Sequence, residues 1–315
     1  RWLGHRVFLP DGSGLSMPDD SALQRAFGQP KGAKKGCGFP VMHVLWMFDA
    51  ATGLIVDLVS GRWNRQDIAD VLKLHAKLEP GDVMIADRAF CSYSHLASIL
   101  QHQLHAVIRM HQRRIIDFRC GRKQRAQWPK SQRQGKSTSR FLEKLGVMDQ
   151  CVEYPKPKER PNWMSPQDFA VLPETIVVRE LHYRIRRQGF RTRQVTLVTT
   201  LLDADRYPRD ELAQLYQSRW QVETNLRHLK QTMNMDVLRC NTPGGILKEL
   251  WVFVLAYNLI RLLMLRAARL QSVDPNRVSF IDARDCLRHR PPDDSIPVLI
   301  INPKRPNRDE PRVTK

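Results

Sequence analysis

The sequence lacks any closely spaced pair of cysteines. Its six cysteines are scattered and form no Cys-x-x-Cys motif: Cys37, Cys91, Cys120, Cys151, Cys240 and Cys286. Disulfide frameworks and structural zinc sites are built from cysteines at short, regular spacings. We therefore expect reduced thiols in an intracellular protein, and no zinc site.

Long apolar runs are also missing. The longest, Leu250 to Leu265, contains Asn258 and Arg261 and is shorter than the roughly 20 apolar residues that a helix needs to cross a bilayer. It predicts a buried helix. Binding to a membrane surface would call for a basic amphipathic helix with a clean apolar face, and no segment stands out as one.

Acidic residues are scarce relative to basic ones. The chain has 51 Lys and Arg against 32 Asp and Glu, a formal charge of +19 and a pI near 10.1. Such an excess favours a polyanionic partner, most often nucleic acid. With 42% hydrophobic residues in 315, the chain can still bury a sizeable core.

The basic residues are densest between Arg109 and Lys144, where twelve Lys or Arg face two acidic residues. Such a run can be an ordinary solvated face. The functional interpretation is a groove or flap that neutralises phosphates, with Trp128 stacking on a base. We expect part of 119–140 to be disordered.

The order of predicted elements suggests a mixed α/β sheet. Apolar runs predict a strand at 7–9 ended by a turn at 10–12, a surface loop over 12–40, strands at 41–48 and 54–59 joined by a turn at 49–53, a helix at 65–77, a strand at 81–87, a helix at 94–101 and a strand at 104–109. Ribonuclease-H-like sheets have this order, as do other mixed folds.

The chain divides into four predicted regions by composition. We expect the first part of a catalytic core at 1–109, a basic, β-rich insertion at 110–203, C-terminal helices at 204–270 and a partly disordered tail at 271–315. One long helix is predicted from Tyr207 to about Met233, and a second at 246–270. Because the sequence opens on Arg1, we expect it to be a fragment that lacks an N-terminal part.

The segment Leu215 to Lys230 carries the most specific pattern. On one continuous helix, Tyr216, Arg219, Glu223 and Lys230 fall within about 60° of one another, beside an apolar face. Without further context this could be an exposed helix stabilised by pairs such as Arg219–Glu223.

The spacing Tyr-x2-Arg-x3-Glu-x6-Lys is, however, the signature of the insertion sequence 4 family of transposases, and the chain resembles that family without departure from it. Tyr207-Pro208, Arg219-Trp220 and the run LAYNLIR ending at Arg261 strengthen the resemblance, which covers about residues 5 to 265. It implies a ribonuclease-H-like α/β fold, a mixed sheet flanked by helices, with a β-rich insertion before the last catalytic helix.

The resemblance also implies three catalytic carboxylates. The first belongs to an Asp-Gly-Ser motif, here Asp11, and the second to an Asp-Arg motif, here Asp87; Glu223 is the third. Taken alone, Asp11 would be a turn residue, whereas a strand end such as Asp87 is where sites are built in α/β sheets. Asp49 and Asp57 compete for the first role, but neither precedes Gly-Ser.

Three carboxylates suit two hard divalent cations, Mg²⁺ or Mn²⁺, which activate an attacking oxygen and stabilise the leaving one. We predict that Asp11 bridges both ions while Asp87 and Glu223 each hold one. A water would attack first, and the freed 3′-OH second.

Further residues are predicted to contact DNA. The resemblance implies that Arg219 and Lys230 bind phosphates and that Tyr216 positions the strand; the remaining candidates are Arg88, Trp128 and Trp163. A packing role stays open for both tryptophans. The three histidines His102, His105 and His111 match no usual metal-ligand spacing.

The resemblance implies a DNA transposase that hydrolyses transposon ends in a metal-dependent reaction and joins the 3′-OH to target DNA. We expect a DNA-dependent homodimer in the bacterial cytoplasm, associated with the nucleoid and not with a membrane. The alternatives are a non-catalytic DNA-binding protein derived from a transposase, and a ribonuclease-H-like nuclease without strand transfer.

Overall fold

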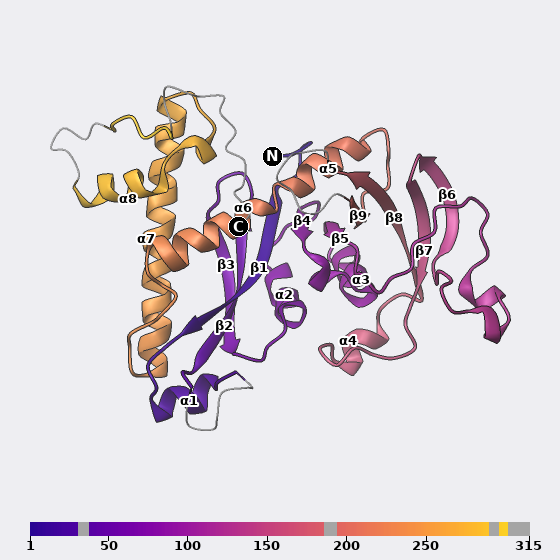
Figure 1. Cartoon of the computed structure of the whole chain (residues 1–315), viewed down its shortest axis with the longest axis horizontal. Helices are drawn as coiled ribbons and strands as arrows, with labels where there is room; N and C mark the ends of the chain where they lie inside the picture. The colour runs from indigo at the N-terminus through magenta and orange to yellow at the C-terminus, as the bar shows by residue number, and fades with distance from the viewer. Residues whose placement is uncertain (31–37, 186–193, 290–295, 302–315) are drawn as a thin grey trace. The chain divides into compact units, whose positions relative to one another are not determined.

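The computed structural model describes residues 1–30, 38–185, 194–289 and 296–301. Its described residues divide into two compact units: the first holds Arg1–Asp11 and Gln66–Arg219, and the second holds Gly12–Arg65 and the described residues from Trp220 onward. The described strands form a nine-stranded sheet in the order β3-β2-β1-β4-β5-β9-β8-β7-β6 (Figure 1). Strand β1 (Val7–Ser16) starts in the first unit and ends in the second.

The first unit is built around three parallel strands. β1 pairs with β4 (Val83–Ala86), and β4 pairs with β5 (His105–Arg109). Every residue of β4 is buried, as expected for a central parallel strand. The connecting elements are α2 (Asp67–His75), the 3₁₀ turn η1 (Arg88–Phe90) and α3 (Tyr93–Gln101). These elements confirm the sequence predictions for 65–109.

The chain after Arg109 extends this sheet. β9 (Gln194–Thr199) pairs antiparallel with β5, and β8 (Thr175–Arg184), β7 (Asp149–Pro155) and β6 (Arg140–Gly146) follow outward, each antiparallel to its neighbour. The sequence predicted that 110–203 is rich in β-strand but did not locate β6 and β7. The helices of this part are α4 (Pro166–Ala170) and α5 (Arg209–Gln217).

Residues 119–140, expected to be partly disordered, are all described. They contain two 3₁₀ turns, η2 (Arg125–Gln127) and η3 (Lys130–Gln132). The backbone amide of Arg125 bonds to the Ser137 carbonyl, so the two ends of the segment are held together. We call 119–140 the basic lobe.

The second unit combines a hairpin with helices. β2 (Val41–Asp49) and β3 (Ile55–Arg62) are antiparallel, and the Gly53 amide bonds to the Asp49 carbonyl in the predicted turn. The helical elements are α1 (Ser21–Phe27), α6 (Trp220–Arg227), the π-helical turn η4 (His228–Thr232), α7 (Pro243–Leu270), the 3₁₀ turn η5 (Pro275–Arg277) and α8 (Phe280–Arg288).

The prediction of a turn at 10–12 was wrong. β1 continues through Asp11 and Gly12 to Ser16, whose amide bonds to the Asp236 carbonyl and whose carbonyl accepts the Leu238 amide. Glycine can adopt extended backbone, and this pairing with the chain after η4 outweighs its turn tendency. The predicted loop over 12–40 accordingly contains the end of β1 and the helix α1.

The single helix predicted from Tyr207 to Met233 is interrupted. α5 ends at Gln217 and α6 begins at Trp220. Between them the Ser218 and Arg219 amides bond to carbonyls three residues back, and η4 then adopts the wider π-helical winding. A helical wheel with a constant angle per residue therefore does not describe the segment from Tyr216 to Lys230.

Helix α7 is buried on one face only. The Tyr257 hydroxyl donates to the Gly53 carbonyl (2.9 Å), and the Arg261 guanidinium donates to the Thr52 carbonyl (3.0 and 2.7 Å). The helix is long and apolar enough to cross a membrane, but these polar contacts identify it as a core helix of the second unit. The opposite face corrects the prediction of a buried helix, because Trp251 and Leu255 are 51% and 61% exposed.

The described residues thus form the expected α/β architecture, a mixed sheet flanked by helices, with the order β3-β2-β1-β4-β5 of a ribonuclease-H-like sheet. Of the predicted tail at 271–315, residues 290–295 and 302–315 lie outside the described residues. Within 296–301, Ile300 forms an isolated antiparallel bridge with Val278.

Candidate active site

Asp11 and Asp87 occupy corresponding positions on neighbouring parallel strands. β1 and β4 pair with a constant offset, Val7 with Val83 and Phe8 with Met84. Continued along both strands, this offset aligns Asp11 with Asp87. Registered residues of parallel strands project from the same face of a sheet, and the carboxyl ends of such strands are where α/β folds bind ligands. The register therefore indicates that the two carboxylates project from the same face of the sheet in the first unit.

Local hydrogen bonds fix the Asp87 carboxylate. Its Oδ1 accepts the Ala89 amide at 2.7 Å, which caps the 3₁₀ turn η1. The neighbouring Arg88 donates from Nη1 to Oε1 of Gln112 at 2.6 Å. The half-buried Asp87 is thus held at the end of β4, while its Oδ2 has capacity for another ligand.

Tyr216 and Arg219 lie near Asp87 in the first unit. The Arg219 guanidinium is 6.0 Å from the centre of the Tyr216 ring. Burial raises the pKa of Tyr216, and the negative charge of Asp87 raises it further, while the positive charges of Arg219 and Arg109 oppose the shift. The two signature residues at this end of the motif therefore share one electrostatic environment with the second aspartate.

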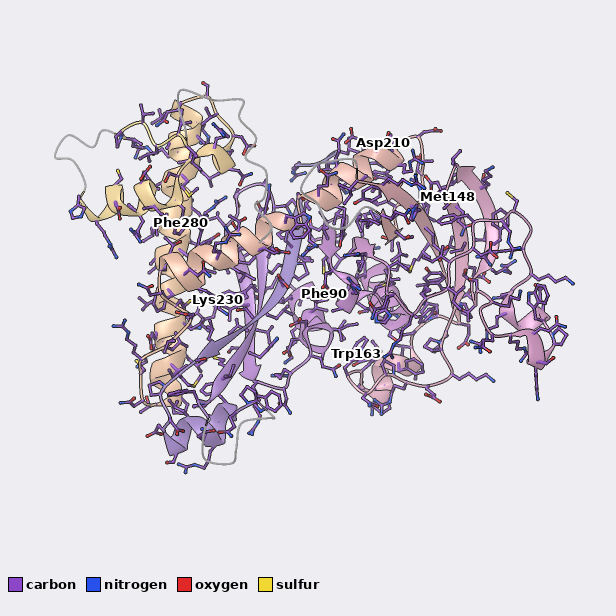
Figure 2. All side chains as sticks on the ribbon, viewed as in Figure 1. Phe90, Met148, Trp163, Asp210, Lys230 and Phe280 are labelled. Carbon is purple, nitrogen blue, oxygen red and sulfur yellow. The ribbon has the colours of Figure 1, made fainter. Side chains whose placement is uncertain are left out.

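Glu223 and Lys230 belong to the second unit. Glu223 is half-buried in the first turn of α6. Lys230, labelled in Figure 2, donates from Nζ to the Gly14 carbonyl at 2.9 Å. Gly14 closely follows Asp11-Gly12-Ser13, so the lysine of the signature contacts the same strand that carries the first aspartate.

The two competing aspartates have local structural roles. Asp49 accepts the amide and hydroxyl of Thr52, both at 2.7 Å, and so closes the β2–β3 turn. Asp57 lies on β3 and accepts the Leu58 amide at 2.8 Å. Their contacts favour Asp11 for the first role.

The tryptophans named from the sequence belong to other segments than Asp11 and Asp87. Trp128 is half-buried in the basic lobe, where the Lys136 ammonium lies 4.2 Å from its ring centre and that of Lys123 5.8 Å away. One face of the ring thus has a cationic neighbour, and base stacking by Trp128 stays a prediction. Trp163 is half-buried in the turn before α4 (Figure 2).

The three histidines named from the sequence have other contacts. Nδ1 of His102 bonds to the Ser98 carbonyl, and His111 Nδ1 accepts the Arg113 amide. The His105 ring lies edge-on to His5, and burial lowers its pKa.

The donor chemistry of the aspartate row suits a hard divalent cation, because carboxylate oxygens are the ligands that Mg²⁺ prefers. Within the described residues, no group of three or more His, Cys, Asp or Glu side chains is arranged to hold a metal ion. The structure therefore aligns two of the three predicted ligands, and the third, Glu223, belongs to the second unit.

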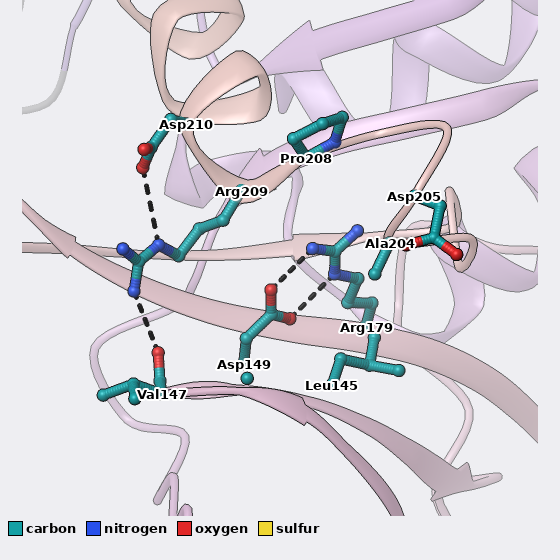
Figure 3. Close-up of a pocket in the computed structure, with 10 residues that line it drawn as sticks. Leu145, Val147, Asp149, Arg179, Ala204, Asp205, Pro208, Arg209 and Asp210 are labelled. Atoms are coloured by element: carbon teal, nitrogen blue, oxygen red, sulfur yellow. Dashed lines mark hydrogen bonds and ion pairs between the residues drawn. The ribbon is translucent and has the colours of Figure 1, made fainter.

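A cavity of about 420 Å³ lies elsewhere in the first unit, between β7, β8 and the start of α5 (Figure 3). Its floor is a buried ion pair, in which the Arg179 guanidinium makes two hydrogen bonds to Asp149 (2.7 and 2.5 Å) and a third to the Tyr207 carbonyl. On its rim Arg209 donates to the Val147 carbonyl. Because the guanidinium groups of Arg179 and Arg209 already have acceptors within the chain, we interpret the cavity as a structural feature and not as a binding site.

Two residues of the aspartate neighbourhood were not named from the sequence. Arg109 ends β5 beside Asp87, and Tyr183 on β8 lies close enough to Tyr216 and Arg109 for their charges to influence its pKa. The register of parallel strands could have indicated Arg109. Nothing in the sequence pattern pointed to Tyr183, because its neighbourhood arises from long-range pairing.

A sheet with two carboxylates on neighbouring parallel strands, in a strongly basic chain, is an arrangement suited to phosphodiester chemistry. Comparison with known proteins makes this specific. A family model described as transposase DDE domain matches residues 2–259, and the chain belongs to that family.

Two curated relatives are similar to the chain. The transposase InsG for insertion sequence element IS4 from Escherichia coli (strain K12) is 25% identical over 286 residues, which cover 90% of this chain and 58% of the relative. A probable transposase for insertion sequence element IS5377 from Geobacillus stearothermophilus is 30% identical over 89 residues, 28% of this chain and 23% of the relative. The chain therefore spans little more than half the length of the IS4 relative.

Among solved structures, the chain is similar to the cryo-EM structure of the piggyBac transposase synaptic complex with hairpin DNA. The TM-score is 0.46 at 13% sequence identity, covering 91% of this chain and 54% of that one.

Proposed function

We propose that the chain is the catalytic part of a DNA transposase that hydrolyses transposon ends and transfers the freed 3′-OH to target DNA. The observation that carries this proposal is the register of β1 and β4, which, when continued, aligns Asp11 within β1 with Asp87 directly after β4, in a chain of the transposase DDE domain family. The core would comprise 1–109 and 204–270, with 110–203 as its insertion and 271–315 as a tail.

Asp11, Asp87 and Glu223 would hold two Mg²⁺ or Mn²⁺ ions. Bound ions would activate the attacking oxygen and stabilise charge on the leaving one. The alignment of the two aspartates and the spacing of Glu223 within the signature support this ligand set. Among the other side chains, Arg219 and Lys230 would bind DNA phosphates and Tyr216 would position the DNA strand. Arg88, Trp128 and Trp163 would be further DNA contacts.

The decisive experiment measures metal-dependent nicking of duplex DNA that carries a transposon end. We expect nicking with Mg²⁺ or Mn²⁺ and none with EDTA. Asp87→Asn and Glu223→Gln should each reduce the rate at least about 1,000-fold, since each removes a charged metal ligand. Asp57→Asn is the matched control, because it also neutralises one half-buried aspartate, and it should leave the rate within about threefold.

The outcomes separate the alternatives. A pre-cut 3′-OH end that becomes joined to target DNA supports a transposase, whereas cleavage without joining supports a ribonuclease-H-like nuclease. DNA binding without any metal-dependent nicking supports a non-catalytic DNA-binding protein. Full activity of Glu223→Gln would contradict the assignment of the third carboxylate. Assembly of a DNA-dependent homodimer, which we also propose, is read from the mass of the DNA complex.

A further inference from the structure

Arg109 is the third member of the row that contains the two aspartates. β4 and β5 pair in parallel with a constant offset, from Val83 with His105 to Ala86 with Ile108. The next step along both strands aligns Asp87 with Arg109. Asp11, Asp87 and Arg109 therefore occupy corresponding positions on three adjacent parallel strands, two anions followed by one cation.

Two tyrosines surround the cationic end of this row. Tyr183 lies on β8 opposite Val195 of β9, the strand that pairs with β5. Tyr216, at the end of α5, is buried to 6% exposure. Burial and the neighbouring Tyr216 raise the pKa of Tyr183, and the positive charge of Arg109 opposes the shift. Arg109 is opposite Leu197, and Leu197 is opposite Leu181, so Tyr183, two residues further along β8, projects from the same face of the sheet as Arg109. The same cation and Asp87 both influence the pKa of Tyr216.

Tyr183 and Arg109 have unused hydrogen-bonding capacity. The Tyr183 hydroxyl is buried and has no hydrogen-bond partner among the described residues. Within the described residues, the half-buried Arg109 guanidinium also makes no hydrogen bond or ion pair that would occupy its donors. Buried hydroxyls in native proteins are nearly always paired, and a guanidinium offers five donors in a geometry that matches phosphate. Both features point to a missing acceptor.

We propose that Arg109 and Tyr183 form a phosphate-binding site that holds one backbone phosphate of the DNA strand beside Asp87. The guanidinium and the hydroxyl donate to the non-bridging oxygens, and the Arg109 charge offsets the repulsion between the phosphate and the aspartate pair. They are positioning residues: they fix the strand so that the neighbouring phosphodiester lies at the aspartates. The proposal rests on the proposed function, because the phosphate is that of the strand to be cut.

The test combines protein variants with single-phosphate neutralisation. Nicking is measured on a series of duplexes, each with one methylphosphonate, which removes the charge of one phosphate near the cut. On unmodified DNA, Arg109→Gln should lower kcat/KM about 10- to 100-fold and Tyr183→Phe about 5- to 10-fold, through a higher KM. On the one duplex whose contacted phosphate is neutral, Arg109→Gln should have almost no further effect.

Two control variants accompany the test. Arg266→Gln removes the same charge from an exposed arginine of α7, and should leave kcat/KM within about twofold on every duplex. Arg109→Lys keeps the charge and should recover part of the activity, which separates a phosphate contact from loss of the fold. Circular dichroism checks that each variant is folded.

The outcomes for this site and for the proposed function differ. If the wild type cuts DNA but the effects of Arg109→Gln and of phosphate neutralisation on kcat/KM are additive at every phosphate, the proposed phosphate-binding site is wrong. The transposase proposal then still stands. If the wild type does not cut, the proposed function is wrong, and fluorescence anisotropy with the same duplexes tests the site by binding. In that binding assay, a non-additive effect of Arg109→Gln and the neutralisation of one particular phosphate on the affinity would support the phosphate-binding site. Additive effects at every phosphate would overturn it.

Discussion

His75 and His95 form a buried pair of neutral imidazoles between α2 and α3. Their Nε2 atoms are 3.2 Å apart and their rings are stacked, with centres 5.3 Å apart. Nδ1 of His95 donates to the Phe90 carbonyl, so its Nε2 must accept a proton from His75 if both rings are neutral. This assigns the proton of His75 to Nε2, and agrees with the absence of a partner at its Nδ1 among the described residues.

Burial makes this pair sensitive to acid. It lowers the pKa of His75 to about 2 and that of His95 to about 4, and the positive charges that His95 and His102 can carry add to the shift of His75. The unfolded chain binds these protons from about pH 6.5 downward, while the folded chain does not. The stability that the neutral pair contributes is therefore complete above pH 6.5 and is lost progressively as the pH falls from 6.5 toward 4.

We predict that the free energy of unfolding falls by about 1.4 kcal/mol per pH unit for each of the two histidines below pH 6.5. His75→Phe should reduce this slope by about one histidine's share, because phenylalanine does not titrate. Urea denaturation at pH 7.5, 6 and 5 measures the slope. His289→Gln, which replaces an exposed histidine at the end of α8, should keep the wild-type slope; an unchanged slope in His75→Phe would contradict the assignment.

At the scale of elements, the β2–β3 hairpin and α7 depend on each other through Gly53. This residue has a φ of +70°, and a Cβ atom built on it would lie 2.1 Å from Nη2 of Arg261. The guanidinium cannot move away without breaking its bonds to the Thr52 carbonyl, and it is buried to 3% exposure. The hairpin turn therefore fits α7 only when glycine occupies this position.

We predict that Gly53→Ala lowers the free energy of unfolding by more than the cost of a left-handed alanine, which is about 1–2 kcal/mol. The matched control is Gly81→Ala, since Gly81 also has a positive φ (+89°) but no atom within 4 Å of the added Cβ. The free energies of unfolding of the two variants, measured by urea denaturation, should differ by at least about 1 kcal/mol. Equal midpoints would show that Arg261 yields without cost.

Elements with strong local patterns were predictable, and edge elements were not. β4 is a fully buried apolar run, and α2 has helical periodicity, so both matched the sequence prediction. β6 is an edge strand with Arg140, Glu143 and Lys144 exposed. Charged residues at such positions protect an edge from aggregation, and they also hide the alternation that would mark a strand.

The candidate site shows the same division. Asp87 could be placed from sequence because a strand ending in an acidic residue is a local pattern. The environment of Arg109 depends on which strands pair, and pairing is decided by the whole sheet. The phase of Lys230 relative to Tyr216 could not be derived, since the break after Gln217 and the π-helical turn η4 both change the helical rotation.

At the scale of the whole molecule, the charge of +19 is distributed unequally between structural and available cations. In the basic lobe most of the arginine side chains make contacts within the chain. Arg119 pairs with Asp117, Arg122 bonds to Ser139, and Arg133 bonds to the Trp128 and Ala126 carbonyls. Together with Arg140, which pairs with Glu153, they give a segment with little secondary structure its shape.

The lysines of the basic lobe have no such bonds. Within the described residues, Lys123, Lys130 and Lys136 make no hydrogen bond or ion pair, although two of them face Trp128. Their ammonium groups are therefore available to phosphates without breaking the lobe.

We predict that these lysines contribute to the salt dependence of DNA binding. Each phosphate contact releases counterions and adds about 0.9 to the slope of log K against log salt concentration. The triple variant with Lys123→Gln, Lys130→Gln and Lys136→Gln should therefore lower the magnitude of the slope by about 2 to 3, as measured by fluorescence anisotropy between 50 and 300 mM salt, a range spanning about a sixfold change in screening ions. A control with Lys77→Gln, Lys158→Gln and Lys248→Gln removes the same net charge from exposed positions outside the lobe. If both triple variants changed the slope equally, the net charge of the chain, and not the basic lobe, would govern its attraction to DNA.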